Sequence, residues 1–466
     1  TQNNELQGLN GDGEILSISL SGINPGICDI TINDLCLMDE SSNQINSLIY
    51  ICINFITQVF KSIFQKISVK QKHMKNKKHF LFLVLAGLLC LSSVQAQISY
   101  GTYDPTKKCV VDANGECIPN TILSAVPFLR IVPDARSGAL GDAGLAISPD
   151  ANAMHFNAAK LAFAEQDFEV SATYTPWLKN LGLNDVYLAY LSGYNKLDDL
   201  QAVGYSLRFF SLGEIDFRDE DGNPSGNGKP REFEISGAYS RKLGDRLSGG
   251  VSAKYIYSNL ASGQQVGGID IKTAHAFAAD ISVYHKSKVK MGNYDSQLTF
   301  GLSVSNLGSK VSYSESVDKD FIPANFGLGS ALDINFDEYN SMTFTIDINK
   351  LLLPTPDTTN VKFDGSSINA AIASWLDAPG GITEELRELY FSTGVEYWYD
   401  KQFAVRAGYF YENPLKGDRQ FLTVGVGLKY NVYGMNLSYL VPTNNRRNPL
   451  DNTLRFSLLF DFTSQK

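Results

Sequence analysis

The sequence has 466 residues, of which 44% are hydrophobic and 19% are charged, so its composition indicates a folded chain and excludes a disordered one. The formal net charge of −9 argues against a general nucleic-acid-binding protein, because phosphate contacts need a basic surface. No apolar run of about 18 residues is free of charged and polar residues, which argues against a membrane-spanning helix.

Residues 1–73 form the first segment. Their stretch "NGDGEILSISLSGINPGICDITINDLCLMDESSNQIN" alternates apolar and polar residues and predicts two or three strands. It loosely resembles the C-terminal half of a cohesin-like module. Because an export signal follows it, and such signals stand at the start of a chain, we interpret this segment as a non-native extension joined in frame. We assign it no function.

Residues 74–96, "MKNKKHFLFLVLAGLLCLSSVQA", have the three parts of a secretory signal peptide. Lysines at positions 75, 77 and 78 form the basic region, an apolar stretch follows, and the small residue Ala96 precedes the expected mature start at Gln97. A buried core helix is the alternative. Leu89 stands before Cys90 where a lipid-attachment signal has a small residue, so we do not expect a lipoprotein.

Two cysteines, Cys109 and Cys117, remain after the signal peptide. In an exported chain this spacing favours a small disulfide loop. A zinc site is less favoured, since two thiols without nearby histidines leave the metal half-coordinated.

Residues 97–166 are too apolar for an unstructured tail, and their stretch "RSGALGDAGLA" carries glycines at 138, 141 and 144. A phosphate-binding loop would need a preceding strand and a Lys-Ser/Thr end, and neither is present. We therefore interpret this segment as a hatch that enters and plugs a barrel formed by the residues after it. The glycines would let its backbone run close to the inner wall.

From residue 167 the sequence alternates with period two. In "LRFSLLFDF", Leu454, Phe456 and Leu458 share one face, while Arg455 and Ser457 share the other. Inward glycines at 408, 425 and 427 leave room in the lumen or relieve bends in the strands. The fourteen segments of this kind lie near 167–177, 184–192, 201–210, 232–241, 247–257, 273–284, 294–305, 324–332, 341–350, 390–398, 402–411, 420–430, 434–440 and 453–462.

The connections alternate between short and long. Short turns such as "NKLDDL", "KLGDR", "KSKVKMGNY" and "YDK" alternate with the long loops 211–231, 258–272, 306–323, 351–389 and 441–452; only the first loop, 178–183, is short. This asymmetry is typical of outer-membrane barrels. The fold class we predict is all-β, a transmembrane antiparallel β-barrel of about 14 strands with an N-terminal hatch, over residues 167–466. A soluble β-sandwich is the alternative.

The stretch "ARSGALGDAGLAISPDANAMHFNAAKLAF" resembles the hatch of the FadL-like barrel superfamily. That superfamily has an Asn-Pro-Ala-Gly-Leu motif, which reads Asn-Ala-Ala-Lys-Leu at 157–161 here, so its proline and glycine are both replaced. The residues that carry the resemblance are Arg136, Gly138, Gly141, Asp142, Gly144 and Asn157.

Within that superfamily, "VPFLRIVPDARSGALGDAG" and "NNRRNPLDNTLRFSLLFDF" are similar to the PorV family of the type IX secretion system. The resemblance implies a bacterial outer-membrane protein that is not an enzyme. It would bind the C-terminal signal domains of cargo proteins as they leave the type IX translocon barrel. It would then deliver them to a sortase-like surface complex that attaches cargo to lipopolysaccharide.

The loop 351–389 is the candidate docking site. Its residues Ile368, Ala371, Ile372 and Trp375 fall on one helical face. Such an apolar face either binds a partner or packs on neighbouring loops.

Two other functions compete with secretion. A FadL-like transporter of hydrophobic small molecules would need an apolar pocket between hatch and wall. An outer-membrane enzyme acting on lipid A would need a Ser/His or His/Asp group, which we cannot assemble. We expect no metal and no cofactor: in "DEDGNPSGNGKP" prolines at 224 and 230 replace the glycine and glutamate of a calcium loop, and the histidines are scattered.

Overall fold

The chain is described by a computed structural model, which we treat as two separate units, Thr1–Gln95 and Ala96–Lys466. The structure describes residues 121–177, 183, 185–218, 224–266, 269–315, 319–355, 363, 365–378, 381–444 and 452–462, together with five short strands before residue 112.

Three of these short strands form an antiparallel sheet in the first unit, in the order β1 (Leu6–Leu9), β2 (Ile15–Asn24) and β3 (Ile27–Thr31). In the second unit, β4 (Thr102–Asp104) pairs with β5 (Cys109–Val111). The expected signal peptide and Cys117 lie outside the described residues, as does the side chain of Cys109. The signal peptide and the disulfide therefore stay predictions.

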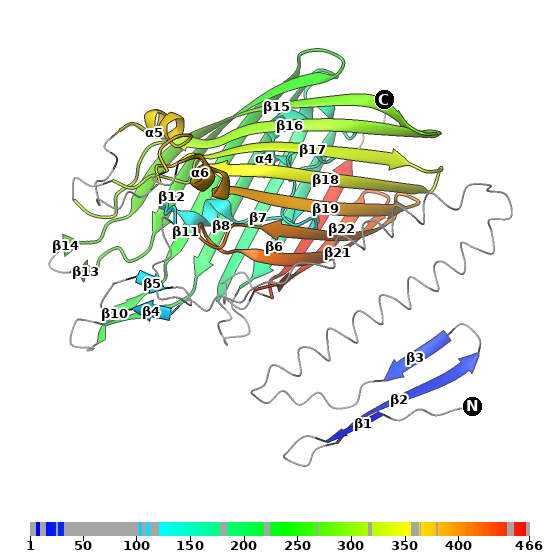
Figure 1. The fold of residues 1–466 in the computed structure, drawn as a ribbon, viewed down its shortest axis with the longest axis horizontal. Coiled ribbons are helices and arrows are strands. Elements are labelled where there is room, and N and C mark those ends of the chain that lie inside the picture. Colours follow the sequence, from blue (N-terminus) through cyan, green and yellow to red (C-terminus); the bar gives the residue numbers. More distant parts are fainter. Residues whose placement is uncertain are drawn as a thin grey trace. The chain divides into compact units, whose positions relative to one another are not determined.

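Fourteen antiparallel strands close into a barrel, and the last strand pairs with the first (Figure 1). The prediction of fourteen strands is confirmed. We call these strands the wall. They are β6 (Phe168–Pro176), β7 (Val186–Lys196), β8 (Gln201–Leu212), β11 (Arg231–Lys242), β12 (Leu247–Asn259), β15 (Ala274–Met291), β16 (Tyr294–Gly308), β17 (Asn325–Asn335), β18 (Asn340–Leu351), β19 (Leu389–Tyr399), β20 (Phe403–Tyr411), β21 (Gln420–Tyr430), β22 (Tyr433–Pro442) and β23 (Leu454–Phe462).

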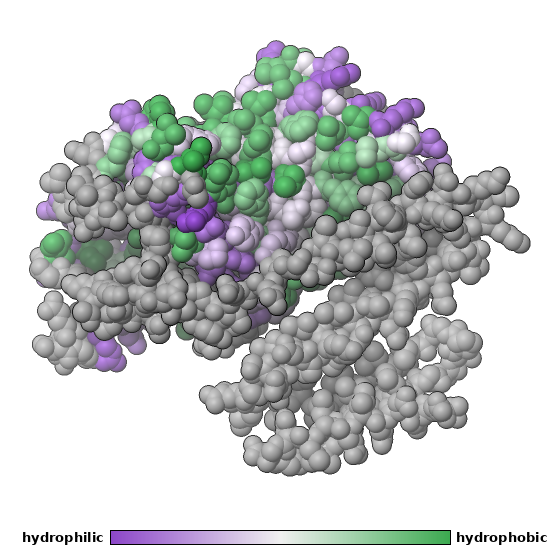
Figure 2. All heavy atoms as spheres, in the orientation of Figure 1, coloured by the Kyte–Doolittle hydropathy of each residue, from purple (hydrophilic) through white to green (hydrophobic). Residues whose placement is uncertain are grey.

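The wall is apolar outside and polar inside. In β23, Leu454 and Leu458 are exposed, whereas Arg455 and Ser457 are buried, and β21 repeats the alternation with exposed Val424. Figure 2 shows hydrophobic residues over the middle of the visible wall and hydrophilic residues toward both ends. This arrangement suits a wall surrounded by hydrocarbon, which offers no hydrogen-bond partners to polar groups.

The two ends of the barrel differ, as the sequence predicts. Short turns join the strands at one end. The long loops at the other carry the hairpins β9 (Ile215–Arg218)–β10 (Pro224–Gly228) and β13 (Gln265–Val266)–β14 (Ile269–Asp270), and the helices α5 (Ser367–Ala373) and α6 (Ile382–Arg387). Among the described residues, no helix is long and apolar enough to span a membrane.

One predicted turn is wrong. The stretch "KSKVKMGNY" at 286–294 belongs mostly to strands, because Lys286–Met291 pair with Tyr294–Thr299 and leave only Gly292 and Asn293 as the turn. The lysines at 286, 288 and 290 keep the period of a strand.

Residues 121–166, which we call the hatch, lie inside the barrel. They form η1 (Pro127–Arg130), α3 (Ala135–Gly138), α4 (Ala153–Phe156) and η2 (Ala158–Phe163). The helix η2 contacts β8, β11, β12 and β15, whereas α3 contacts β21, β22 and β23 across the lumen. The hatch thus fills the barrel from one side of the wall to the other (Figure 1).

A charge on the outer face tests the membrane location of the wall. We expect Val424→Arg, in the middle of β21, to lower the free energy of unfolding in lipid by roughly 2–4 kcal/mol, because the guanidinium must enter hydrocarbon. Leu428→Arg, nearer the end of the same strand, should cost about 0–1 kcal/mol. Urea unfolding in vesicles measures both; equal costs would contradict a membrane-spanning wall.

Candidate functional site

The hatch approaches the wall most closely at glycines on both sides. Gly141 has φ +69°, and its N–H donates to Thr423 Oγ1 at 2.9 Å. A Cβ at Gly141 would lie 2.5–2.7 Å from backbone atoms of Tyr409 and Thr393, and a Cβ at Gly408 would run into the backbone of Leu140 and Gly141. Backbone therefore lies on backbone here, which only glycine permits.

The other two hatch glycines meet side chains. A Cβ at Gly138 would lie 2.5 Å from the guanidinium of Arg455, and one at Gly144 would lie 2.5 Å from the ring of Phe156. On the wall, a Cβ at Gly425 would run into Ala139, while one at Gly427 would meet Arg406 and Asn436. Small inward residues at 408 and 425 thus leave room for the hatch, one of the two explanations that the sequence left open.

Arg136 clamps α3 to the wall. Its Nε and Nη2 donate to the two carboxylate oxygens of Glu396 in β19 at 3.0 and 2.8 Å, and its Nη1 donates to Asp150 at 2.9 Å. Arg406 in β20 donates to the same Glu396 at 2.6 Å. One buried carboxylate therefore holds two guanidinium groups, and paired bidentate contacts of this kind are the strong ones.

The remaining hatch-motif residues also reach the wall. Asp142 lies 3.4 Å from Arg455 Nη2, and the Asn157 side chain donates to the carbonyls of Leu145 and Val283 at 3.2 and 3.0 Å. The N–H groups of Gly144 and Leu145 both donate to Asp347 in β18, at 2.7 and 2.9 Å. The structure thus brings all six motif residues into the hatch–wall interface.

Lys160 occupies the position where the FadL-like motif has glycine, and sequence reasoning assigned it no role. Its side chain is buried, and its Nζ donates to the Gly144 carbonyl at 2.6 Å, which ties two parts of the hatch together. Burial lowers the pKa of Lys160 to about 8. The signal that could have identified it is the departure from the motif itself.

Arg208 in β8 anchors η1. Its buried Nη1 donates to the carbonyls of Phe128, Leu129 and Ile131, at 3.0–3.4 Å, where the 3₁₀ helix ends. Its Nη2 lies 2.6 Å from His155 Nδ1, and burial together with the charge of Arg208 holds the pKa of His155 well below its usual range. His155 is therefore neutral and accepts this hydrogen bond.

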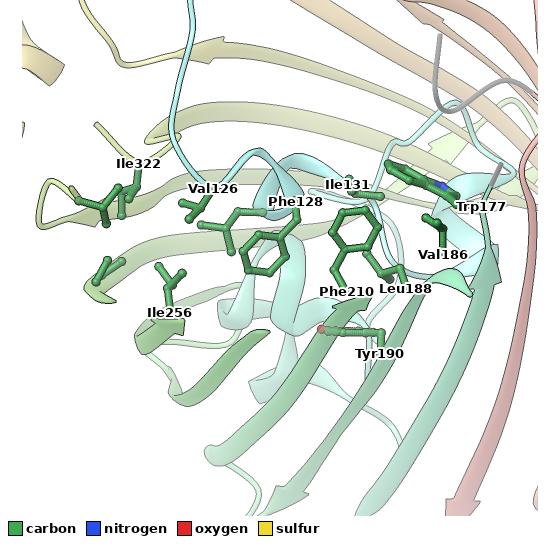
Figure 3. Packing of buried hydrophobic residues seen from close by; sticks show 14 of the residues in the cluster. Val126, Phe128, Ile131, Trp177, Val186, Leu188, Tyr190, Phe210, Ile256 and Ile322 are labelled. Atoms are coloured by element: carbon green, nitrogen blue, oxygen red, sulfur yellow. The ribbon is translucent and has the colours of Figure 1, made fainter. Parts of the chain in front are cut away.

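Apolar packing fixes the same part of the hatch. Figure 3 shows Val126, Phe128 and Ile131 of the hatch against Leu188 and Phe210 of the wall. Arg130 also reaches Glu412 at 3.3 Å, and Arg419 pairs with that carboxylate at 2.8 Å, so η1 is joined to the loop after β20.

A cavity of about 90 Å³ remains between hatch and wall. Charged and amide side chains from both sides line it, including Asp142, Lys254, Asp347, Asn349 and Arg419. Apolar side chains, among them Leu129, Leu145 and Phe410, complete a lining of mixed polarity. Among the residues that the structure describes, no group of three or more His, Cys, Asp or Glu side chains is placed to hold a metal ion.

The outer loop 351–389 presents an apolar surface, which we call the α5–α6 surface. Its exposed members are Ile368, Ile372, Trp375, Leu376, Ile382 and Leu386. Ala371 does not belong to it, contrary to the prediction: it packs in a buried cluster with Ile122, Leu351 and Leu353. The physical reason is that α5 needs small residues on the side that rests on the barrel rim.

Buried ion pairs hold this loop to the rim. Lys350, at the end of β18, pairs with Glu385 at 3.0 Å and with Glu388. Lys416 pairs with Glu388 at 3.0 Å and with Glu384 at 2.7 Å. These ion pairs thus fix the α5–α6 surface to the rim of the barrel.

A closed fourteen-stranded barrel with an apolar exterior, short turns at one end and a folded hatch inside is a bacterial outer-membrane β-barrel protein. The family model described as "Type IX secretion system protein PorV" matches residues 114–358, which is more than half of the chain. The chain therefore belongs to the PorV family and is an outer-membrane component of the type IX secretion system. The resemblance to this family that the sequence indicated is confirmed.

No curated protein matches the chain. Among solved structures, the toluene transporter TodX from Pseudomonas putida is 13% identical, with coverage of 71% of this chain and 99% of TodX and a TM-score of 0.43. The Ralstonia pickettii toluene transporter TbuX is 12% identical, with coverage of 71% and 98% and a TM-score of 0.41. A Pseudomonas aeruginosa FadL homologue is 11% identical, with coverage of 74% and 100% and a TM-score of 0.37.

Removing the charge of Glu396 tests whether its ion pairs with Arg136 and Arg406 hold the hatch in the barrel. We expect Glu396→Gln to lower the free energy of unfolding by roughly 3–5 kcal/mol, because Arg136 and Arg406 lose a buried counter-charge. Glu214→Gln removes the exposed partner of Lys229 and should cost less than about 1 kcal/mol. Urea unfolding in vesicles compares the two variants. Equal losses of unfolding free energy in the two variants would show that the ion pairs of Glu396 do not hold the hatch.

The low pKa of Lys160 predicts a pH dependence of stability. Between pH 8 and about 10.4 the unfolded chain binds a proton at this lysine that the folded chain does not, so stability rises with pH across that window. Lys160→Met should lack this rise. The measurement is the urea midpoint of both proteins against pH, and identical pH dependences would contradict the assignment.

Proposed function

We propose that this protein binds the C-terminal signal domains of type IX cargo at its outer loops and shuttles them from the translocon barrel to a sortase-like surface complex. The α5–α6 surface carries this proposal. It exposes five large aliphatic side chains and one tryptophan at the end of the barrel with the long loops. Exposed apolar patches of this kind mark sites of protein interaction.

The ion pairs beneath the α5–α6 surface hold it in one conformation, which favours binding of a folded partner. Because Lys350 and Lys416 hold α6 through buried carboxylates, the surface loses little conformational entropy when it docks. Trp375 is fixed from below by an edge-on contact with Phe326, at 5.3 Å between ring centroids. A pre-ordered aromatic anchor among aliphatic residues is the composition of a binding hot spot.

The lumen favours this role over transport of hydrophobic small molecules. A transporter would need an apolar pocket between hatch and wall. Within the part of the chain that the structure describes, the cavity at that place measures about 90 Å³, and charged side chains such as Asp142, Lys254 and Asp347 share its lining with apolar ones. An apolar cavity that binds benzene measures roughly 150 Å³, and burial of charges against an apolar ligand is costly.

The protein would therefore act by binding and not by catalysis. Its partners would be cargo signal domains, the translocon barrel and the attachment complex, with lipopolysaccharide around the outer end. This is the chemistry of recognition: apolar anchors supply affinity, and charged groups at the rim supply orientation.

Charge on the α5–α6 surface tests the proposal. We expect Ile372→Glu with Leu376→Glu to reduce surface-attached cargo several-fold in a proteomic count, because docking would bury the two carboxylates. Cargo should then accumulate before attachment.

The control is Ile269→Glu, which places the same charge on an exposed apolar residue in another outer loop, and it should leave the cargo count unchanged. Amounts of the three proteins in the outer membrane must be equal. Unchanged surface cargo in the double variant, or growth defects confined to hydrophobic nutrients after gene deletion, would contradict the proposal.

A further inference from the structure

The hairpin of β15 and β16 extends past its neighbour at the end of the barrel with the short turns. The pairing of β12 with β15 ends at Leu247 and His285, and the last backbone bond between them joins Lys286 N–H to the Arg246 carbonyl at 2.8 Å. β15 continues to Met291, paired only with β16. Figure 1 shows the joined ends of these strands at the right-hand end of the barrel.

This extension leaves an open strand edge. Backbone groups alternate in direction along a strand, and Lys286 directs its N–H toward β12. Lys288 and Lys290 share that phase, so their N–H and C=O groups point to the side where β12 has ended. Within the described part of the chain, no strand pairs with β15 on that side beyond His285. Unpaired edges are templates for an added strand.

The side chains along this edge are basic and face the barrel mouth. Lys286, Lys288 and Lys290 share the face of the buried, inward Ser282 and Tyr284. Lys286 Nζ lies 4.4 Å from the ring centroid of Phe163 in the hatch, and Lys242 Nζ lies 5.2 Å from the same ring. Lys242 and Lys286 therefore lie beside the hatch, and Lys288 and Lys290 continue along the same face of β15. We call these four the mouth lysines.

The charge balance at this place is positive. Asp295 lies opposite Lys290 in β16, and Glu165 lies close enough to Lys286 to interact with it. Among the described residues, neither Lys288 nor Lys290 forms an ion pair within 4.0 Å. The face toward the surrounding bilayer carries Ser287, Val289 and Met291 instead, so the charges are not directed at lipid headgroups.

We propose that the open edge of β15 at Lys286–Met291 binds an acidic, extended segment of a partner polypeptide by strand addition at the periplasmic mouth of the barrel. Main-chain hydrogen bonds to Lys288 and Lys290 would fix the register of the added strand against β15, and the mouth lysines would select acidic side chains. Lysines on an edge disfavour pairing with a second copy, which would place lysine against lysine. This site lies at the opposite end from the α5–α6 surface and does not depend on it.

A synthetic peptide of alternating Glu and Val, labelled with a fluorophore, tests the edge on the full chain in nanodiscs. We expect binding by anisotropy that weakens with salt. Two further peptides of the same sequence are N-methylated, one on the odd-numbered amides and the other on the even-numbered amides. The peptide whose methylated amides would face β15 loses the main-chain bonds and should bind about tenfold more weakly than the parent. A Lys-Val peptide should not bind.

Variants locate the site. Lys288→Gln with Lys290→Gln should weaken binding about tenfold, as two charge contacts are lost. Lys288→Pro removes an edge N–H and leaves the bonds to β16, so it should weaken binding further than Lys288→Gln alone. Lys401→Gln, in the turn between β19 and β20, is the matched control and should have no effect.

Three results would overturn the proposal: no binding of the Glu-Val peptide at low salt, equal binding of both N-methylated peptides and the parent, or unchanged affinity in the double glutamine variant. Retention of phosphatidylglycerol vesicles that depends on Lys288 and Lys290, without peptide binding, would assign the edge to lipid and also overturn it. The peptide comparison uses the unmodified protein, so a variant that fails to fold leaves the test intact.

Discussion

The absence of hydrogen-bond partners in hydrocarbon is the constraint on which the structure depends. Each backbone N–H and C=O of the wall must find its partner within the protein, so the strands pair until the last meets the first. Period-two alternation then places every second side chain inside, and the sequence supplies Arg455, Arg406, Glu396 and Asp347 at those positions. Closing the wall thus creates a lumen full of charged groups that need partners of their own.

The hatch resolves that second requirement. Its backbone amides bind Asp347 and Thr423, its arginine binds Glu396, and its helix end lies against Arg208. Glycines on both surfaces allow the approach. The hatch is therefore the polar core of the barrel as much as a plug, and its buried pairs specify one position for it along the lumen. With the lumen occupied, the binding that we propose is left to the two ends of the barrel, where the outer loops and the open edge of β15 lie.

The sequence predicted the elements better than the contacts between them. Period-two alternation marked all fourteen strands, since each face has a uniform environment. The apolar character of residues 97–166 indicated a hatch, of which residues 121–166 lie inside the barrel. Pairs such as Arg136 and Glu396, separated by 260 residues, follow only from closure of the barrel and register of the hatch. Ala371 was misplaced because helical periodicity does not say which edge of an apolar stripe touches the rim. The lysines of β15 were placed in a turn, whereas they continue the alternation of the strand.

The central claim is that the hatch is a bound, folded part of the barrel interior. Amide hydrogen exchange on the protein in nanodiscs measures this directly, through peptides covering residues 135–163. The account predicts exchange as slow as that of the wall strands, because the amides of Ala135, Gly141, Gly144 and Ala162 donate to wall side chains. Exchange within seconds, at the rate of an unstructured tether, would contradict it.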